Sequence, residues 1–150
     1  MAGAVRVEGA EQLAALSARL KAAGAVDLRR ELYKALNRAT KPAKQAAKRE
    51  ALSRLPHRGG LNQLVASSRL STRTRAGRNP GVTIVAKGSS NISRIDKGKV
   101  RHPVYGNRNT WVTQSVPEGW FTDPMRDNAD NVRDELENAV QDVAHRLGAL

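Results

Sequence analysis

Residues 100–121 read VRHPVYGNRNTWVTQSVPEGWF, and they hold four of the five aromatic residues in this chain of 150. The four are Tyr105, Trp111, Trp120 and Phe121, and the rest of the chain adds one tyrosine. Aromatic rings bury much apolar area per side chain and dominate cores and interfaces. We therefore expect the packing centre and a contact surface near this segment. It contains neither a nucleophile–base pair nor a metal-ligand cluster, which favours a protein that assembles with others over a catalyst.

Downstream of the aromatic segment, the sequence predicts a closing amphipathic helix. Apolar residues recur three or four positions apart from Met125 to Leu147, which is the period of a helix with one buried face. Asp123 is expected to cap this helix, and Pro124 suits its first position. Five side chains are predicted core anchors where the helix packs on a sheet: Trp120, Phe121, Val132, Leu136 and Val143.

Four short strands are predicted within and upstream of the aromatic segment. Residues 69–75 alternate in polarity and residues 82–86 are apolar, and a turn at 79–81 pairs them as an antiparallel hairpin. Residues 100–105 and 110–116 form a second strand pair. We expect these four strands to make one small antiparallel sheet.

Two helices are predicted before the strands. Residues 9–23 form a short one, and a long one begins near Asp27, with Leu and Ala on one stripe and Lys and Arg on the opposite face. Pro42 lies inside the long pattern and predicts a kink or a break there. Helices, then strands, then a helix, without βαβ alternation, indicate an α+β fold in a single domain spanning residues 1–150.

Residues 87–99, KGSSNISRIDKGK, are polar, basic and rich in Gly and Ser. This composition predicts a long mobile loop that orders on binding. The candidate contact residues in it are Lys87, Arg94, Lys97 and Lys99.

The net charge of +12 is spread unevenly along the chain. Residues 28–110 carry twenty basic and three acidic groups, whereas residues 111–150 carry three basic and eight acidic groups. The basic middle predicts an acidic partner, either nucleic acid or an acidic protein surface, and the asymmetry also allows head-to-tail self-association. A solvated basic helix face that only maintains solubility is the alternative interpretation.

Several function classes find no support in the sequence. There is no Cys, the three His residues stand outside ligand motifs, and no phosphate-binding glycine loop occurs, so we expect no metal, no cofactor, no catalytic residues and no enzyme activity. No apolar run is long enough for a membrane span, so no membrane partner is expected. A small basic nucleic-acid-binding protein remains the alternative function, although no known nucleic-acid-binding motif is present.

The order of several short motifs resembles a known family. A basic, Ala-rich helix is followed by Pro56-His57-Arg58-Gly59-Gly60-Leu61, then by strands and the His-Pro and Gly segment at 101–108. Gln114-Ser115-Val116-Pro117 and Trp120-Phe121-x-x-Pro124 then lead into the closing helix. Over residues 28–147 the chain resembles the tail-completion or neck proteins of long-tailed bacteriophages, also described as head–tail connectors.

The resemblance implies a structural virion protein, made in the bacterial cytoplasm, that forms a ring, with six copies expected, at the head-proximal end of the tail. Its implied partners are further copies of itself, a connector or stopper protein, and a tail terminator or tube protein. Genomic DNA would pass through the channel of the ring. The resemblance favours a contact role for one part of the aromatic segment, and six residues are the candidate interface: Arg101, His102, Tyr105, Asn107, Arg108 and Trp111.

Overall fold

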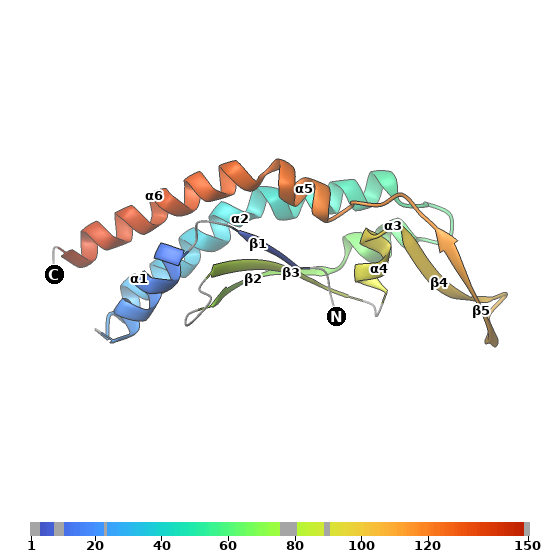
Figure 1. The fold of residues 1–150 in the computed structure, drawn as a ribbon, viewed down its shortest axis with the longest axis horizontal. Helices are drawn as coiled ribbons and strands as arrows, with labels where there is room; N and C mark the ends of the chain where they lie inside the picture. The colour runs from blue at the N-terminus through green and yellow to red at the C-terminus, as the bar shows by residue number, and fades with distance from the viewer. Residues whose placement is uncertain (1–3, 8–10, 23, 76–80, 89–90, 149–150) are drawn as a thin grey trace.

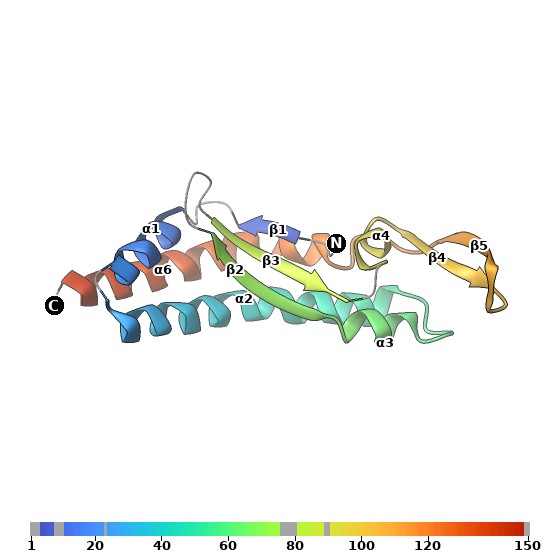
Figure 2. The ribbon, with the colours of Figure 1, turned by 90° about the horizontal axis from the view of Figure 1, so that it is seen from below.

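The computed structural model describes residues 4–7, 11–22, 24–75, 81–88 and 91–148. Within these ranges it is an α+β fold, as the sequence predicts, in which a layer of long helices lies over a small sheet and a slender hairpin extends from one end (Figures 1 and 2). Layers of this kind arise because one apolar helix stripe and one apolar sheet face bury each other.

Two long antiparallel helices, α2 (Val26–Arg54) and α6 (Ala129–Gly148), form the main helical layer (Figure 1). The shorter α1 (Glu11–Ala22) packs against both. The sequence predicted a kink or a break at Pro42; a break does not occur, because α2 is helical on both sides of it. The buried Ala39 and Ala43 flank Pro42, so tertiary packing on both sides of the proline holds this segment in helical form.

The strands form two sheets where the sequence predicted one. The first sheet is antiparallel, in the order β1 (Ala4–Val7), β3 (Gly81–Lys87), β2 (Arg69–Arg75). The second is a separate antiparallel pair, β4 (Lys99–Val104) and β5 (Asn107–Ser115). Strand β1 was not predicted, because four residues are too few to show a period. The predicted turn at 79–81 falls largely outside the described residues.

Three short helices connect these elements: α3 (Leu61–Ala66), α4 (Ile92–Asp96) and α5 (Thr122–Asp127). Residues 87–99 therefore do not form the single long loop that the sequence predicted, because α4 occupies Ile92–Asp96. Ile92 and Ile95 are buried in the core and hold α4 in place. Lys87 ends β3 and Lys99 begins β4. Two isoleucines three positions apart outweigh the polar composition, because their burial supplies the free energy that orders the segment.

The closing helix differs from its prediction in three respects. It is divided at Asn128 into α5 and α6, and α6 packs mainly along α2 and α1 and only slightly on the first sheet, through β1. Asp123 does not occupy the cap position, because it lies in the first turn of α5 and pairs with Arg54 at 2.8 Å. The hydrogen bond with Asp123 is the main reason that the pKa of Arg54 is raised.

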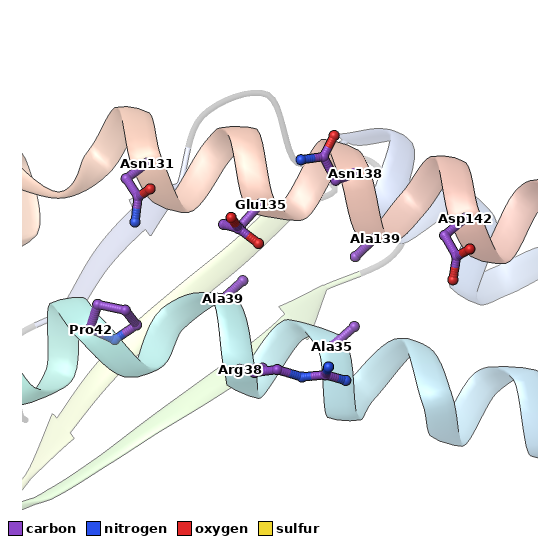
Figure 3. A pocket seen from close by; sticks show the side chains of 9 residues that line it. All are labelled: Ala35, Arg38, Ala39, Pro42, Asn131, Glu135, Asn138, Ala139 and Asp142. Carbon is purple, nitrogen blue, oxygen red and sulfur yellow. The ribbon is translucent and has the colours of Figure 1, made fainter.

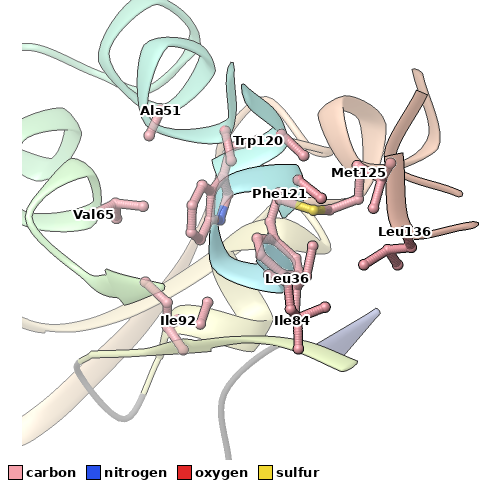
Figure 4. Close-up of a cluster of buried hydrophobic side chains, with 14 of the residues drawn as sticks. Leu36, Ala51, Val65, Ile84, Ile92, Trp120, Phe121, Met125 and Leu136 are labelled. Atoms are coloured by element: carbon pink, nitrogen blue, oxygen red, sulfur yellow. The ribbon is translucent and has the colours of Figure 1, made fainter. Parts of the chain in front are cut away.

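The core surrounds Trp120 and Phe121, whose side chains are each 1% exposed (Figure 4). Their ring centroids are 5.5 Å apart with a tilted geometry that favours aromatic pairs. The other predicted anchors, Val132, Leu136 and Val143, are buried on α6 in the same cluster. Burying each such large apolar side chain contributes roughly 1.5–3 kcal/mol. This cluster joins α2, α4, α5, α6 and the first sheet into one body.

Candidate functional site: the β4–β5 arm

The pair β4 and β5 extends from the body as an arm (Figures 1 and 2). All nine residues of β5 are exposed, and no residue of β4 is fully buried. Besides pairing with each other, the two strands pack mainly against α4, at the base of the arm. An isolated two-stranded hairpin is only marginally stable in water. The arm therefore presents both faces and both edges to any partner.

The tip of the arm is a two-residue turn that exposes an aromatic ring. Tyr105 has a φ of 47° and Gly106 a φ of 76°, the left-handed pair that suits a tight hairpin turn. Tyr105 is fully exposed, at 104%. A tyrosine in this backbone region is uncommon, and here burial does not compensate for the strain. The sequence predicted a connection of four residues, 106–109, but β5 already begins at Asn107, whose side-chain oxygen accepts the N–H of Asn109 at 3.0 Å.

One face of the arm combines positive charge with an indole ring. We call it the basic face, and it consists of Arg94 of α4, Lys97 just after that helix, and Lys99, Arg101, Trp111 and Thr113 of the arm, which line two adjoining pockets. The guanidinium carbon of Arg101 lies 5.4 Å from the centre of the Trp111 ring, within range of a cation–π interaction. The indole N–H of Trp111 donates to the carbonyl of Arg108 at 2.7 Å. These contacts orient a ring that is still 45% exposed.

The opposite face of the arm is less charged. It carries Val100, His102 and Val112, of which Val100 is half-buried against the core and the other two are exposed. The imidazole ring of His102 contacts the backbone of its own strand, with Nδ1 at 3.1 Å from the carbonyl oxygen of Pro103. Because one face of the arm is basic and aromatic and the other is less charged, we expect a partner to contact the basic face.

The base of the arm is fixed to the body by hydrogen bonds. Asp96 at the end of α4 accepts the backbone N–H groups of Phe121 at 2.8 Å and Thr122 at 3.1 Å, as well as the hydroxyl of Thr122. The N–H of Val116 donates to the carbonyl of Gly98 at 2.9 Å. At the N-terminal end of α4, the side-chain amide of Asn91 donates to the carbonyl of Arg101 at 3.3 Å. The arm thus leaves the body in a defined direction.

The structure brings the six predicted interface residues together on the arm, all exposed: Arg101, His102, Tyr105, Asn107, Arg108 and Trp111. Of the four predicted loop contacts, Arg94, Lys97 and Lys99 lie at the base of the arm on the basic face, whereas Lys87 ends a strand of the other sheet. Sequence reasoning missed Asp96 and Thr113. The only sequence signal for Asp96 was its place as the one acid in a basic segment.

A second surface feature is a groove between α2 and α6, with a volume of about 310 Å³ (Figure 3). Ala35, Ala39 and Pro42 line it from α2, and Glu135 and Asp142 point into it from α6. Beyond the groove, Arg146 of α6 pairs with Glu31 of α2, the main reason that the pKa of Arg146 is raised. The sequence did not predict this groove, because it depends on which sides of two distant helices meet.

Two kinds of site are not found in the described part of the chain. No three of its His, Asp or Glu residues are grouped to hold a metal ion. None of its helices combines the length and apolar character that crossing a bilayer requires. Comparison of the chain with family models, with curated proteins and with solved structures finds no match. The arm and the groove are therefore interpreted from their own chemistry.

Proposed function

We propose that this protein is a structural subunit of the neck of a long-tailed bacteriophage. In this proposal, copies form a ring at the head-proximal end of the tail, complete the tail and join it to the head around the DNA channel. The motif order described above supports the proposal, as does a shape in which one slender element extends from a well-packed body.

The single observation that carries the proposal is the exposure of the arm, in which every residue of β5 is accessible. Tyr105, Trp111 and Val112 are large apolar side chains, and all three are exposed on this one element. Exposed apolar side chains gathered on one element mark an interaction surface. Tyrosine, tryptophan and arginine are also the residues most often found at the energetic centre of protein interfaces.

The proposed partners follow from a position in the neck. They are neighbouring copies in the ring, a connector or stopper protein on the head side, and a tail terminator or tube protein on the tail side. The protein would be made in the bacterial cytoplasm and become part of the virion. Genomic DNA would pass through the channel without being held tightly, because tight binding would slow its ejection.

Native mass spectrometry and negative-stain microscopy of the purified full chain test this function. We expect closed rings, with six copies as the expected number, formed either by the chain alone or on addition of isolated phage tails. The variant Tyr105→Ala/Trp111→Ala should remain folded by circular dichroism and fail to form rings. A chain that stays monomeric under both conditions would contradict the proposal.

Nucleic-acid binding is a second candidate, and the basic face is the observation that favours it. Its cationic side chains can neutralise phosphates, and the exposed Trp111 ring can stack on a base. The discriminating measurement is the affinity for single- and double-stranded DNA over a range of salt concentrations. Binding at physiological salt, with a steep salt slope that Arg94→Ala and Arg101→Ala each reduce, would favour this function over the neck.

A further inference from the structure

We propose that the arm tip of one copy docks in the α2–α6 groove of the next copy. This inference rests on the proposed function, because it identifies the two surfaces that hold neighbouring subunits of the ring together. It concerns two features that are separate in the monomer: the turn at Tyr105 and Gly106 with the adjoining Arg108, and the groove below Glu135 and Asp142.

The two surfaces lie in different parts of the molecule. Figure 1 shows the arm beyond one end of the helical layer and α6 running away from it toward the other end. The body of the protein, including the core around Trp120, lies between them, and the base of the arm is fixed through Asp96. The tip of the arm therefore does not reach the groove of its own chain, and a second copy is the occupant that supplies it.

The chemistry of the groove fits the tip. The small Ala35, Ala39 and Ala139 leave space that a flat aromatic ring can enter. Asn131 and Asn138 are among the residues that line the same groove, and the Asn131 amide, which points toward α2 in Figure 3, can hydrogen-bond a phenol hydroxyl. Tyr105 presents such a ring and hydroxyl with no burial in its own chain. The volume of about 310 Å³ is at the lower end of the range of clefts that hold small ligands, which suits one side chain.

The charges of the two surfaces are complementary. Neither Glu135 nor Asp142 forms a salt bridge with another residue in the described part of the chain, although the charge of Asp142 adds to the effect of Glu31 in raising the pKa of Arg146. Arg38 also lines the groove, from α2. Two carboxylates and one guanidinium give the groove a net charge of −1. The exposed Arg108 lies three residues from Tyr105 and can pair with these acids.

The surface of α6 around the groove and the surface of the arm behind its tip also carry opposite charges. The acids Asp134 and Glu137 are exposed along α6, as is Asp130, which pairs with Arg133, whereas the basic face lies on the arm between its base and Trp111. Such an arrangement attracts the arm toward α6 of another copy and disfavours contact between two α6 helices. The two docking surfaces are different, so the contact is heterologous, and repeating it gives a closed ring when the rotation between copies allows closure.

Because the natural chain has no Cys, directed disulfide formation tests this contact without background. One preparation carries Tyr105→Cys and another carries Asn138→Cys, and the two are mixed under mild oxidation. We expect disulfide-linked heterodimers, identified by mass spectrometry after digestion. The matched control mixes Tyr105→Cys with Gln63→Cys, an exposed position on α3 outside the groove, and should give much less of this product.

A charge exchange tests the same contact without a covalent bond. Glu135→Arg and Arg108→Glu each should weaken self-association about tenfold or more in sedimentation velocity, because each places like charges at the contact. The double variant Glu135→Arg/Arg108→Glu should recover most of the association. Both side chains are exposed, so each monomer is expected to remain folded, which circular dichroism checks.

The outcomes separate this inference from the function on which it rests. Rings that form normally with Glu135→Arg, or that give no more disulfide with Asn138→Cys than with Gln63→Cys, overturn the groove contact and leave the neck proposal intact. A chain that neither associates nor cross-links, alone or with phage tails, overturns both. DNA binding that Arg101→Ala weakens, in a chain that does not associate, would replace both with the nucleic-acid function.

Discussion

The carboxylate of Asp96 accepts a hydrogen bond from the backbone N–H of Phe121 at 2.8 Å, across 25 residues of sequence. This bond connects α4, at the base of the arm, to the residue whose ring sits beside Trp120 in the core. The carbonyl of Asp96 accepts the N–H of Gly119 at 2.8 Å as well. Asp96 therefore joins the base of the exposed arm to the most deeply buried part of the body. These hydrogen bonds fix the orientation of the arm relative to the core.

Replacing Asp96 should destabilise the protein by an amount that depends on the acceptor that remains. Asp96→Ala leaves the N–H groups of Phe121 and Thr122 without their partner, and we expect it to lower the free energy of unfolding by about 2–3 kcal/mol. Asp96→Asn keeps one side-chain oxygen and should cost about 1 kcal/mol. Urea denaturation followed by circular dichroism measures both. Equal losses for the two variants would show that the side-chain acceptor is unimportant.

Gly119 and Gly106 form a matched pair for testing the geometry at the base of the arm. Both have positive φ, but a Cβ on Gly119 would lie 2.5 Å from an oxygen of Asp123, whereas one on Gly106 would meet nothing within 4 Å. Asp123 pairs with Arg54 at 2.8 Å, and moving its carboxylate away from a new Cβ would disturb that pair. Gly106→Ala should therefore cost about 1 kcal/mol of backbone strain, and Gly119→Ala clearly more. Thermal unfolding of both variants makes the comparison, and a smaller loss at Gly119 would contradict this geometry.

The two ends of the aromatic segment should respond differently to truncation. Trp120→Ala removes a fully buried ring and should lower the free energy of unfolding by about 3–5 kcal/mol. Tyr105→Asn removes an exposed ring and introduces a residue that tolerates left-handed backbone, so the monomer should keep its stability or gain up to about 1 kcal/mol. Chemical denaturation measures stability and native mass spectrometry measures assembly. We expect Tyr105→Asn to reduce assembly while the monomer remains folded.

Pro42 offers a test of how α2 tolerates a helix-breaking residue. Proline supplies no backbone N–H, so the carbonyl of Arg38 lacks its usual helical hydrogen bond. Pro42→Ala restores that donor, and since Pro42 is exposed it removes little packing. We expect the free energy of unfolding to rise by about 1–3 kcal/mol in urea titration. An unchanged or lower value would show that the α2–α6 packing depends on the shape that the proline imposes.

The elements with strong periodicity were predicted well. The stripe on α6 and the alternation in residues 69–75 are visible in sequence because each depends on residues a few positions apart. The candidate contact residues on the arm were also placed correctly on one hairpin, because aromatic and basic residues flank an evident turn. The helix α4 was missed, because only two isoleucines in a polar segment signal it.

The sequence by itself determined that this is an α+β protein, and it predicted Trp120 and Phe121 as core residues. Local spacing and side-chain polarity are sufficient for those conclusions. Only the tertiary structure decided that the strands form two sheets, that Asp96 fastens the arm to the core, and that Glu135 and Asp142 face a groove beside α2. These features depend on hydrogen bonds and packing between residues far apart in the chain, and such pairings are not encoded in the spacing of neighbours.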